Sequence, residues 1–293
     1  MLQDAPQITE EDLQKCRDTG DYSPVMFEWY KFVAGLCVTF SNLLQESPVI
    51  RKDISERDYG ILIGLINRAY RLMLTNVALS HEGEFGESTS ILDRCIFESC
   101  VILSWLCATN TEDRFDRYVA SGLRTELELK DQVNLALEKR GGDVLLIEKR
   151  MLDSVADCIA EAGFVDDQIR EMKPLPNLAA MLEALGYKRF AYTAGQRIGS
   201  HHVHGTWVGL RNHFIEKEED TGRYRARQKS YTHINQYVYI TSIVLAALSK
   251  FVDFVFEDAD EEKGEILNLF ESTDENIRML NIEIVGGDFD AIA

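Results

Sequence analysis

Residues 90–118 read SILDRCIFESCVILSWLCATNTEDRFDRY, and the part from Ile91 to Ala108 carries only three charged residues, Asp93, Arg94 and Glu98. Apolar side chains fill most of the remaining positions without strict alternation, which predicts a helix that is buried on most of its sides. Such a helix needs other helices around it. Residues 49–173 contain no proline, and no Asn-Gly or Asp-Gly turn separates β-branched runs. We therefore predict an all-α protein, a single domain of long antiparallel helices.

Helical periodicity extends outward from this stretch along most of the chain. It predicts helices at 24–46, 53–80, 88–107, 111–139, 144–161, 177–185, 187–204 and 231–256. Residues 211–229 read as a polar connector, the acidic run 257–262 as a solvated stretch, and residues 282–285 as a candidate short strand. The sequence thus predicts an N-terminal helical arm (1–52), a helical core domain (53–256) and an acidic C-terminal tail (257–293).

The composition limits the compartment and the partners. The 293 residues include 31 Lys and Arg against 49 Asp and Glu, a net charge of −18, which argues against coating a nucleic-acid backbone but leaves room for a small basic pocket. The most apolar stretches, 32–40 and 237–249, are shorter than the ~20 residues that cross a bilayer, so we expect no membrane partner. The six cysteines form no C-x-x-C pair, which favours free thiols in a reducing cytoplasm.

Two charges inside the apolar helix are the first candidate functional residues. Arg94 and Glu98 are four residues apart and therefore share a helix face. Charges that are at least partly buried need partners. The pair either braces a neighbouring helix or lines a polar pocket and orients a catalytic or ligand-binding group.

A histidine-rich strip, YTAGQRIGSHHVHGTW at 192–207, is the second candidate. On a helix, Arg197, His201 and His204 lie at i, i+4 and i+7 and share a face, with Ser200 beside them. Three interpretations stay open. His201 and His204 could bind a metal with a further ligand such as Glu98, one histidine could act as a general acid or base beside Arg197, or the histidines could be core and capping residues.

The two segments together resemble a bacterial family of unknown function, DUF5677. The resemblance rests on Arg94 with Glu98, on Arg117 with Tyr118, and on Ser200 followed by His204-Gly205, and it covers roughly residues 55–255. The family itself implies no activity.

The strip is also similar to the motif of HEPN domains, in which an Arg is followed after four to six residues by a His. Arg197 and His204 fit this spacing, and so does His202; Ile198 follows the Arg where the commonest form of the motif has Asn. The resemblance implies an all-α bundle, often a homodimer, and metal-independent RNase activity in toxin–antitoxin and phage-defence systems, with no cofactor.

In that resemblance a ribose 2′-hydroxyl attacks the adjacent phosphodiester in line. His204 would act as general base or acid, and Arg197 would stabilise the charged transition state. Ser200 would bond a phosphate oxygen, Glu98 would hold an imidazole such as that of His201 or His204 in one tautomer, and Arg94 would compensate the charge of Glu98.

Three functions follow from these observations. The first is a HEPN-like RNase or toxin-like effector with RNA as its substrate. The second is a non-catalytic helical binding or sensor subunit with a protein partner in a defence complex, which suits the acidic surface. The third is a metal-dependent hydrolase that uses the histidines and Glu98.

Overall fold

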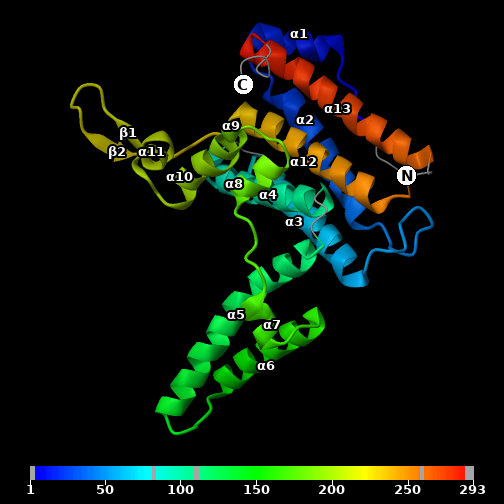
Figure 1. Cartoon of the computed structure of the whole chain (residues 1–293). Helices are drawn as coiled ribbons and strands as arrows, with labels where there is room; N and C mark the ends of the chain where they lie inside the picture. The colour runs from blue at the N-terminus through cyan, green and yellow to red at the C-terminus, as the bar shows by residue number, and fades with distance from the viewer. Residues whose placement is uncertain (1–3, 81–83, 109–111, 258–260, 288–293) are drawn as a thin grey trace. The chain divides into compact units, whose positions relative to one another are not determined.

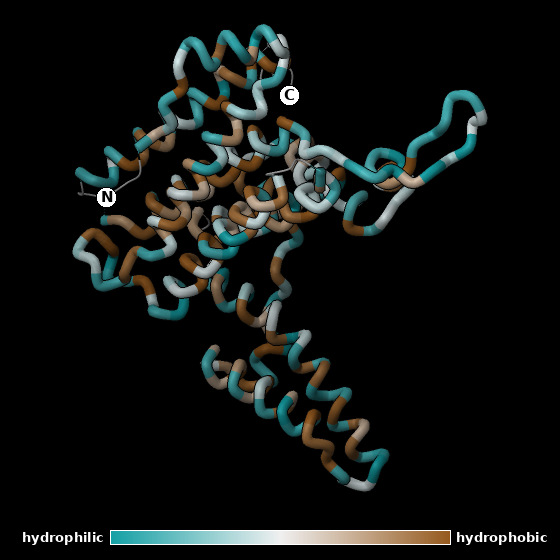
Figure 2. Tube along the Cα trace, turned by 180° about the vertical axis from the view of Figure 1, so that it is seen from behind, coloured by the Kyte–Doolittle hydropathy of each residue, from teal (hydrophilic) through white to brown (hydrophobic). Residues whose placement is uncertain are grey.

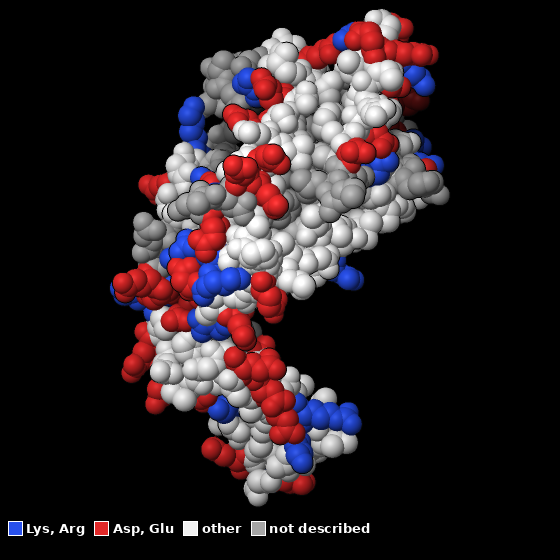
Figure 3. All heavy atoms as spheres, turned by 90° about the vertical axis from the view of Figure 1, so that its right-hand side faces the viewer, with Lys and Arg blue, Asp and Glu red and all other residues white. Residues whose placement is uncertain are grey.

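The computed structural model describes residues 4–80, 84–108, 112–257 and 261–287. Its internal contacts divide the chain into two compact units, residues 1–108 together with 178–293, and residues 109–177. The predicted all-α fold is confirmed (Figure 1). The expected boundaries, after residues 52 and 256, do not coincide with those of the two units. Helices from both ends of the chain belong to the first unit. Asp and Glu side chains are spread over the face shown in Figure 3.

The first unit holds most of the helices. They are α1 (Glu10–Thr19), α2 (Ser23–Ser41), α3 (Glu56–Ser80), α4 (Gly86–Ala108), α8 (Leu178–Ala184), α9 (Arg189–Tyr192), α10 (Gly199–Val203), α11 (Trp207–Gly209), α12 (Ile234–Val255) and α13 (Glu261–Val285), with two π-helical segments, η1 (Thr193–Ile198) and η2 (Leu210–Phe214).

The core of this unit lies between α2, α3, α4 and α12. These helices bury Phe32, Leu62, Phe97 and Phe251 almost completely. The apolar stretch quoted above forms α4, which packs on α3 and α12 and also contacts α8, η1 and α10. A helix with neighbours on all these sides has to be apolar nearly all round. Helix α4 therefore connects the core with the histidine-rich strip.

Helix α12 is longer than its apolar centre. Its 22 residues are long and apolar enough to span a membrane by length and composition, which the shorter stretch 237–249 did not suggest. In this structure the helix packs against α2, α4 and α13, and 56% of its most apolar window is buried inside the protein.

The C-terminal region differs from the expectation. Residues 261–285 form one helix, α13, so residues 282–285 are its last turn and not a strand. Glu257, Glu261 and Glu262 of the acidic run are exposed, as expected, and residues 258–260 lie outside the described residues. Phe270, Thr273 and Ile277 lie at i, i+3 and i+7 and are buried, and the helix packs on α12. Helical spacing of apolar side chains outweighs the β-branched Ile-Glu-Ile-Val at its end.

The connector 211–229 also contains more structure than expected. Strands β1 (Ile215–Lys217) and β2 (Tyr224–Ala226) pair antiparallel, with Glu216 opposite Arg225. That cross-strand pair forms a 2.7 Å ion pair. The loop between the strands ends near Gly222, whose φ of +65° favours glycine.

The second unit is a helical hairpin, α5 (Arg114–Lys139) and α6 (Leu146–Ala162), with the short α7 (Asp166–Glu171). Its buried side chains come from all three helices: Ala120, Leu123, Leu127, Val155, Ile159 and Ile169. Figure 2 shows the same hairpin from behind, coloured by hydropathy.

Candidate functional site

The histidine-rich strip is helical but does not form one regular α-helix. Helix α9 continues into the wider π-turn η1 and then into α10, which ends at Val203. His204 follows the helix end, and Gly205 has a φ of +56°. The spacing that places Arg197, His201 and His204 on one face holds for a regular α-helix, so the wide turn and the early end change how these side chains are spaced. Short π-segments are rare and often occur at functional sites.

Two glycines allow the strip to approach its surroundings closely. A Cβ on Gly195 would lie 2.5 Å from Tyr239 Oη and 2.6 Å from the Phe97 ring. A Cβ on Gly209 would lie 2.5 Å from the carbonyl oxygen of His201. Real Cβ atoms do not come this close to their neighbours. Gly195 therefore fixes the distance between the strip, α4 and α12, and Gly209 lets α11 pack closely against the backbone of α10.

Arg94 and Glu98 face this strip from α4. Arg94 Nε donates to Glu98 Oε1 over 3.3 Å, and the side chains are 19% and 30% exposed. Glu98 Oε1 also accepts a 2.7 Å hydrogen bond from Gln196 Nε2. The stem of Arg94 lies against Gly199. The pair thus has its partner on the strip, and the partner is Gln196.

Ser200 connects to the same group through the backbone. Its Oγ donates a 2.7 Å hydrogen bond to the carbonyl oxygen of Gln196. Together, Arg94, Glu98, Gln196 and Ser200 form a polar chain between α4 and the strip, which we call the α4 brace. Sequence reasoning missed Gln196, although it stands one residue before Arg197, because an uncharged amide gives no signal of its own.

The remaining predicted residues lie outside the α4 brace. His201 Nδ1 is 2.8 Å from Thr206 Oγ1, which ties α10 to the residues that follow it. Arg197 and His204 are exposed. Among the described residues, neither side chain makes a hydrogen bond or ion pair with the brace. The structure therefore brings Arg94, Glu98 and Ser200 together and leaves Arg197 and His204 on the surface of the same segment.

A second histidine group was not expected. The rings of His202 and His213 meet edge to face, and His213 Nδ1 hydrogen-bonds with Ser230 Oγ. Ser230 is in turn held to the start of α4, because its carbonyl oxygen accepts a 2.7 Å hydrogen bond from the Gly86 N–H. These residues are far apart in sequence, so only the fold brings them together.

Burial controls the protonation of this group. It lowers the pKa of His202 to about 4, with further lowering by His213 and His201. Burial also lowers the pKa of His213, while the nearby Glu87 carboxylate acts in the opposite direction. Both effects of burial follow from the cost of a charge away from water. His202 is therefore neutral at pH 7, and its buried Nδ1 has no hydrogen-bond partner among the described residues.

The metal interpretation finds no cluster to support it in the described part of the chain. No group of three or more His, Cys, Asp or Glu side chains there could hold a metal ion. All six cysteines are free thiols, and Cys158 is the exposed one.

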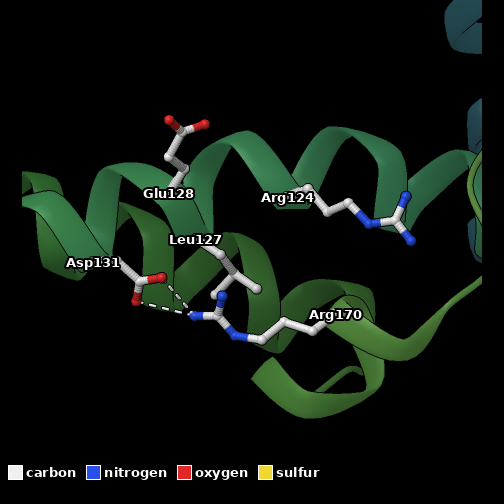
Figure 4. Close-up of a pocket in the computed structure, with 5 residues that line it drawn as sticks. All are labelled: Arg124, Leu127, Glu128, Asp131 and Arg170. Atoms are coloured by element: carbon white, nitrogen blue, oxygen red, sulfur yellow. Dashed lines mark hydrogen bonds and ion pairs between the residues drawn. The ribbon is translucent and has the colours of Figure 1, made fainter.

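A cavity of about 300 Å³ lies in the second unit, lined by Arg124, Leu127, Glu128, Asp131 and Arg170 (Figure 4). Arg170 turns toward Asp131 and donates to both of its carboxylate oxygens, over 3.0 and 2.8 Å. Glu128 points away on the other side of α5. Two cations and two anions leave the cavity without a dominant charge, so we do not assign a charged ligand to it.

The fold and the site define an all-α protein in which a polar brace holds a histidine-rich strip against a central apolar helix. Residues 59–222 match the model of a family of unknown function, DUF5677, and the chain belongs to that family. No curated protein and no solved structure matches the chain. The similarity to HEPN domains stays a prediction from the motif.

Proposed function

We propose that the chain is a HEPN-like, metal-independent endoribonuclease or toxin-like effector whose active strip carries Arg197 and His204. The proposal rests on one observation above all. Both side chains are exposed on a segment that the α4 brace holds in place. In phosphodiester cleavage without a metal, an imidazole on a fixed surface segment can carry a proton and a cation beside it can stabilise the charged transition state.

The charge of the surrounding segment supports an anionic substrate. Residues 187–233 contain nine Lys and Arg against four Asp and Glu, in a chain whose net charge is −18. A polyanion that the net negative charge of the chain repels is attracted to this segment. The segment therefore favours RNA contact close to Arg197 and His204.

In the proposed reaction the ribose 2′-oxygen attacks the adjacent phosphorus and loses its proton, while the bond from phosphorus to the 5′-oxygen breaks and that oxygen gains a proton. His204 exchanges one of these protons, and a water molecule exchanges the other. Arg197 stabilises the negative charge that builds up on the phosphate oxygens. Ser200 acts on the position of the strip through Gln196, as Glu98 and Arg94 do from α4.

We further propose that the protein acts in the cytoplasm as a homodimer. A two-fold axis beside the strip would then bring the strips of both subunits together in one cleft. Phage defence is the setting that the HEPN resemblance implies. Free cysteines suit a reducing compartment.

RNA cleavage by the purified full chain in the presence of a chelator tests the proposal. We expect His204→Ala and Arg197→Ala to lower the cleavage rate about 100-fold or more. Arg223→Ala is the matched control, because it removes an exposed cation from the same segment. If wild type cuts no RNA, or if the His204 variant cuts as fast as wild type, the proposal is wrong.

A non-catalytic binding subunit is the second candidate, and a separate observation favours it. The segment that carries the strip exposes many large apolar side chains: Phe190, Ile198, Val203, Trp207, Val208, Leu210, Phe214, Tyr224 and Tyr231. Exposed apolar surface of this extent is typical of protein interfaces. A stable complex with a partner protein, unchanged by His204→Ala, would support this candidate over the RNase.

A further inference from the structure

The tip of the α5–α6 hairpin exposes four consecutive apolar side chains. Val144, Leu145, Leu146 and Ile147 are 50%, 48%, 66% and 53% exposed. None of them belongs to the buried core of the second unit, which lies further along the hairpin. Leu135 and Met151 add exposed apolar surface nearby. Soluble proteins seldom leave such a run open to water without a functional reason.

The directions of these side chains indicate what covers them. Leu145 has extended backbone dihedral angles, and α6 begins at Leu146. Neighbouring side chains point to opposite sides of an extended segment and about 100° apart on a helix. The four side chains therefore spread around the tip. A groove on another protein contacts one face of a segment, whereas the apolar interior of a bilayer surrounds an inserted tip.

Asp143 and Glu148 border the apolar run directly, and cations lie just beyond them on both sides. Lys139 and Arg140 end α5, and Lys149 and Arg150 follow in the first turns of α6. Arg140 is paired with Glu148, whose carboxylate also accepts from the Leu145 N–H. In the described part of the chain, Lys139, Lys149 and Arg150 make no ion pair. When apolar side chains enter the acyl-chain region of a bilayer, cations within one or two helical turns of them lie at the level of the anionic headgroups.

We propose that the hairpin tip, residues 139–151, inserts into the surface of a lipid bilayer that carries anionic headgroups. The sequence predicted no membrane partner because its apolar stretches are too short to span a bilayer. Surface binding needs only a few exposed apolar side chains and adjacent cations. The inference goes beyond the proposed RNase and does not depend on it.

Vesicle co-sedimentation of the full chain tests the inference. The vesicles contain phosphatidylcholine alone or mixed with phosphatidylglycerol. We expect wild type to sediment with the mixed vesicles, and Leu145→Ser combined with Leu146→Ser to weaken binding about tenfold or more. Val165→Ser is the matched control, because Val165 is an apolar residue of the same unit with 60% exposure outside the tip. The control should bind as wild type does.

The cations give a second, separable readout. Lys149→Glu combined with Arg150→Glu should weaken binding to the mixed vesicles, and added salt should weaken wild-type binding in the same way. The inference is wrong if wild type stays in the supernatant with both vesicles, or if the Leu145 and Leu146 variant binds equally well. It is also wrong if the tip variants dissociate a dimer in solution while vesicles bind none of the proteins, since a second copy would then cover the tip.

Discussion

The imidazole rings of His202 and His213 meet edge to face, with 4.6 Å between their centroids. His213 is tied to Ser230, whereas the buried Nδ1 of His202 has no hydrogen-bond partner in the part of the chain that the structure describes. A positive charge on one ring at this distance opposes a charge on the other. The contact is therefore built for two neutral rings, and it makes the fold around the strip sensitive to acid.

Acidification should destabilise the protein through His202. The pKa of its ring is about 4 in the folded protein, because of burial first and of His213 second. An unfolded histidine takes up its proton near pH 6.5. Between these values the unfolded chain binds more protons, so this contribution to stability is present above pH 6.5 and is lost as the pH falls toward 4. Urea denaturation at a series of pH values should show the loss.

His202→Gln is the variant that isolates this effect, because glutamine does not titrate in this range. The slope of unfolding free energy against pH should be smaller in the variant than in wild type between pH 6.5 and 4. His204→Gln, at an exposed histidine whose ring makes no hydrogen bond in the described part of the chain, should retain the wild-type slope. An NMR titration that places the His202 midpoint near 6.5 would contradict the prediction.

Asp93 should have the opposite pH dependence. Its Oδ1 accepts a 2.6 Å hydrogen bond from Asn76 Nδ2, which also reaches the buried Tyr30 hydroxyl. Its Oδ2 is buried and finds no hydrogen-bond donor within the described ranges, and burial holds the pKa of the carboxyl well above its usual range. The folded protein thus retains a proton that the unfolded chain releases near pH 3.8. Stability from this group falls as the pH rises from there through the folded pKa.

Asp93→Asn should abolish that fall, since the amide has the shape of the protonated acid and carries no charge. We expect the variant to unfold at the same or a higher urea concentration than wild type at pH 7. Asp253→Asn, at an exposed position on α12, is the control and should leave the pH dependence unchanged. A variant less stable than wild type at pH 7 would show that the carboxylate is charged and needed.

The sequence predicted the helical fold because apolar periodicity and the absence of proline act over short distances. It failed at residues 282–285, where the β-branched residues suggested a strand while Phe270 and Ile277 continue one helix onto α12. It also gave no sign of the β1–β2 pair, whose strands are three residues long. A strand of three residues is too short to show the alternation of apolar and polar side chains by which a strand is predicted from sequence.

The candidate site was predictable in part. Arg94 and Glu98 stand out because charges are rare in α4 and because charges that are partly buried need partners. The sequence did not reveal that Glu98 binds Gln196 or that His202 contacts His213. Both contacts depend on the π-turn and on the close approach of the backbone at Gly195 and Gly209. Such contacts join residues distant in sequence, which spacing along one chain does not reveal.

Gly195→Ala should destabilise the protein. The added Cβ would lie 2.5 Å from Tyr239 Oη and 2.6 Å from the Phe97 ring, so one of these side chains must move. We expect a loss of about 1–3 kcal/mol in unfolding free energy. Gly264→Ala on α13, where nothing lies within 4 Å of the new Cβ, should stabilise by up to about 1 kcal/mol instead.

Tyr239→Phe tests the same contact from the other side. The Tyr239 hydroxyl is buried and has no hydrogen-bond partner among the residues that the structure describes, and burial raises its pKa well above the usual range. Removing an unpaired buried hydroxyl should be neutral or stabilising. It should also recover part of the stability lost in Gly195→Ala, because it takes away one of the clashing atoms. Thermal melts of the two single variants and the double variant measure this, and strict additivity would contradict it.

The bond between Glu98 and Gln196 should join α4 to the strip with measurable energy. The contact is 2.7 Å long and charge-assisted, and Glu98 is 30% exposed. We expect Glu98→Ala to cost about 1–3 kcal/mol of unfolding free energy, since Arg94 and Gln196 both lose their acceptor. Gln196→Ala should cost less, because Arg94 stays paired. In the double variant the two losses should overlap, giving a coupling of about 1 kcal/mol in a double-mutant cycle.

The matched cycle of Glu216 and Arg225, an exposed ion pair on β1 and β2, should give a smaller coupling that salt abolishes. Additive losses at Glu98 and Gln196 would mean that this hydrogen bond does not hold the strip to α4.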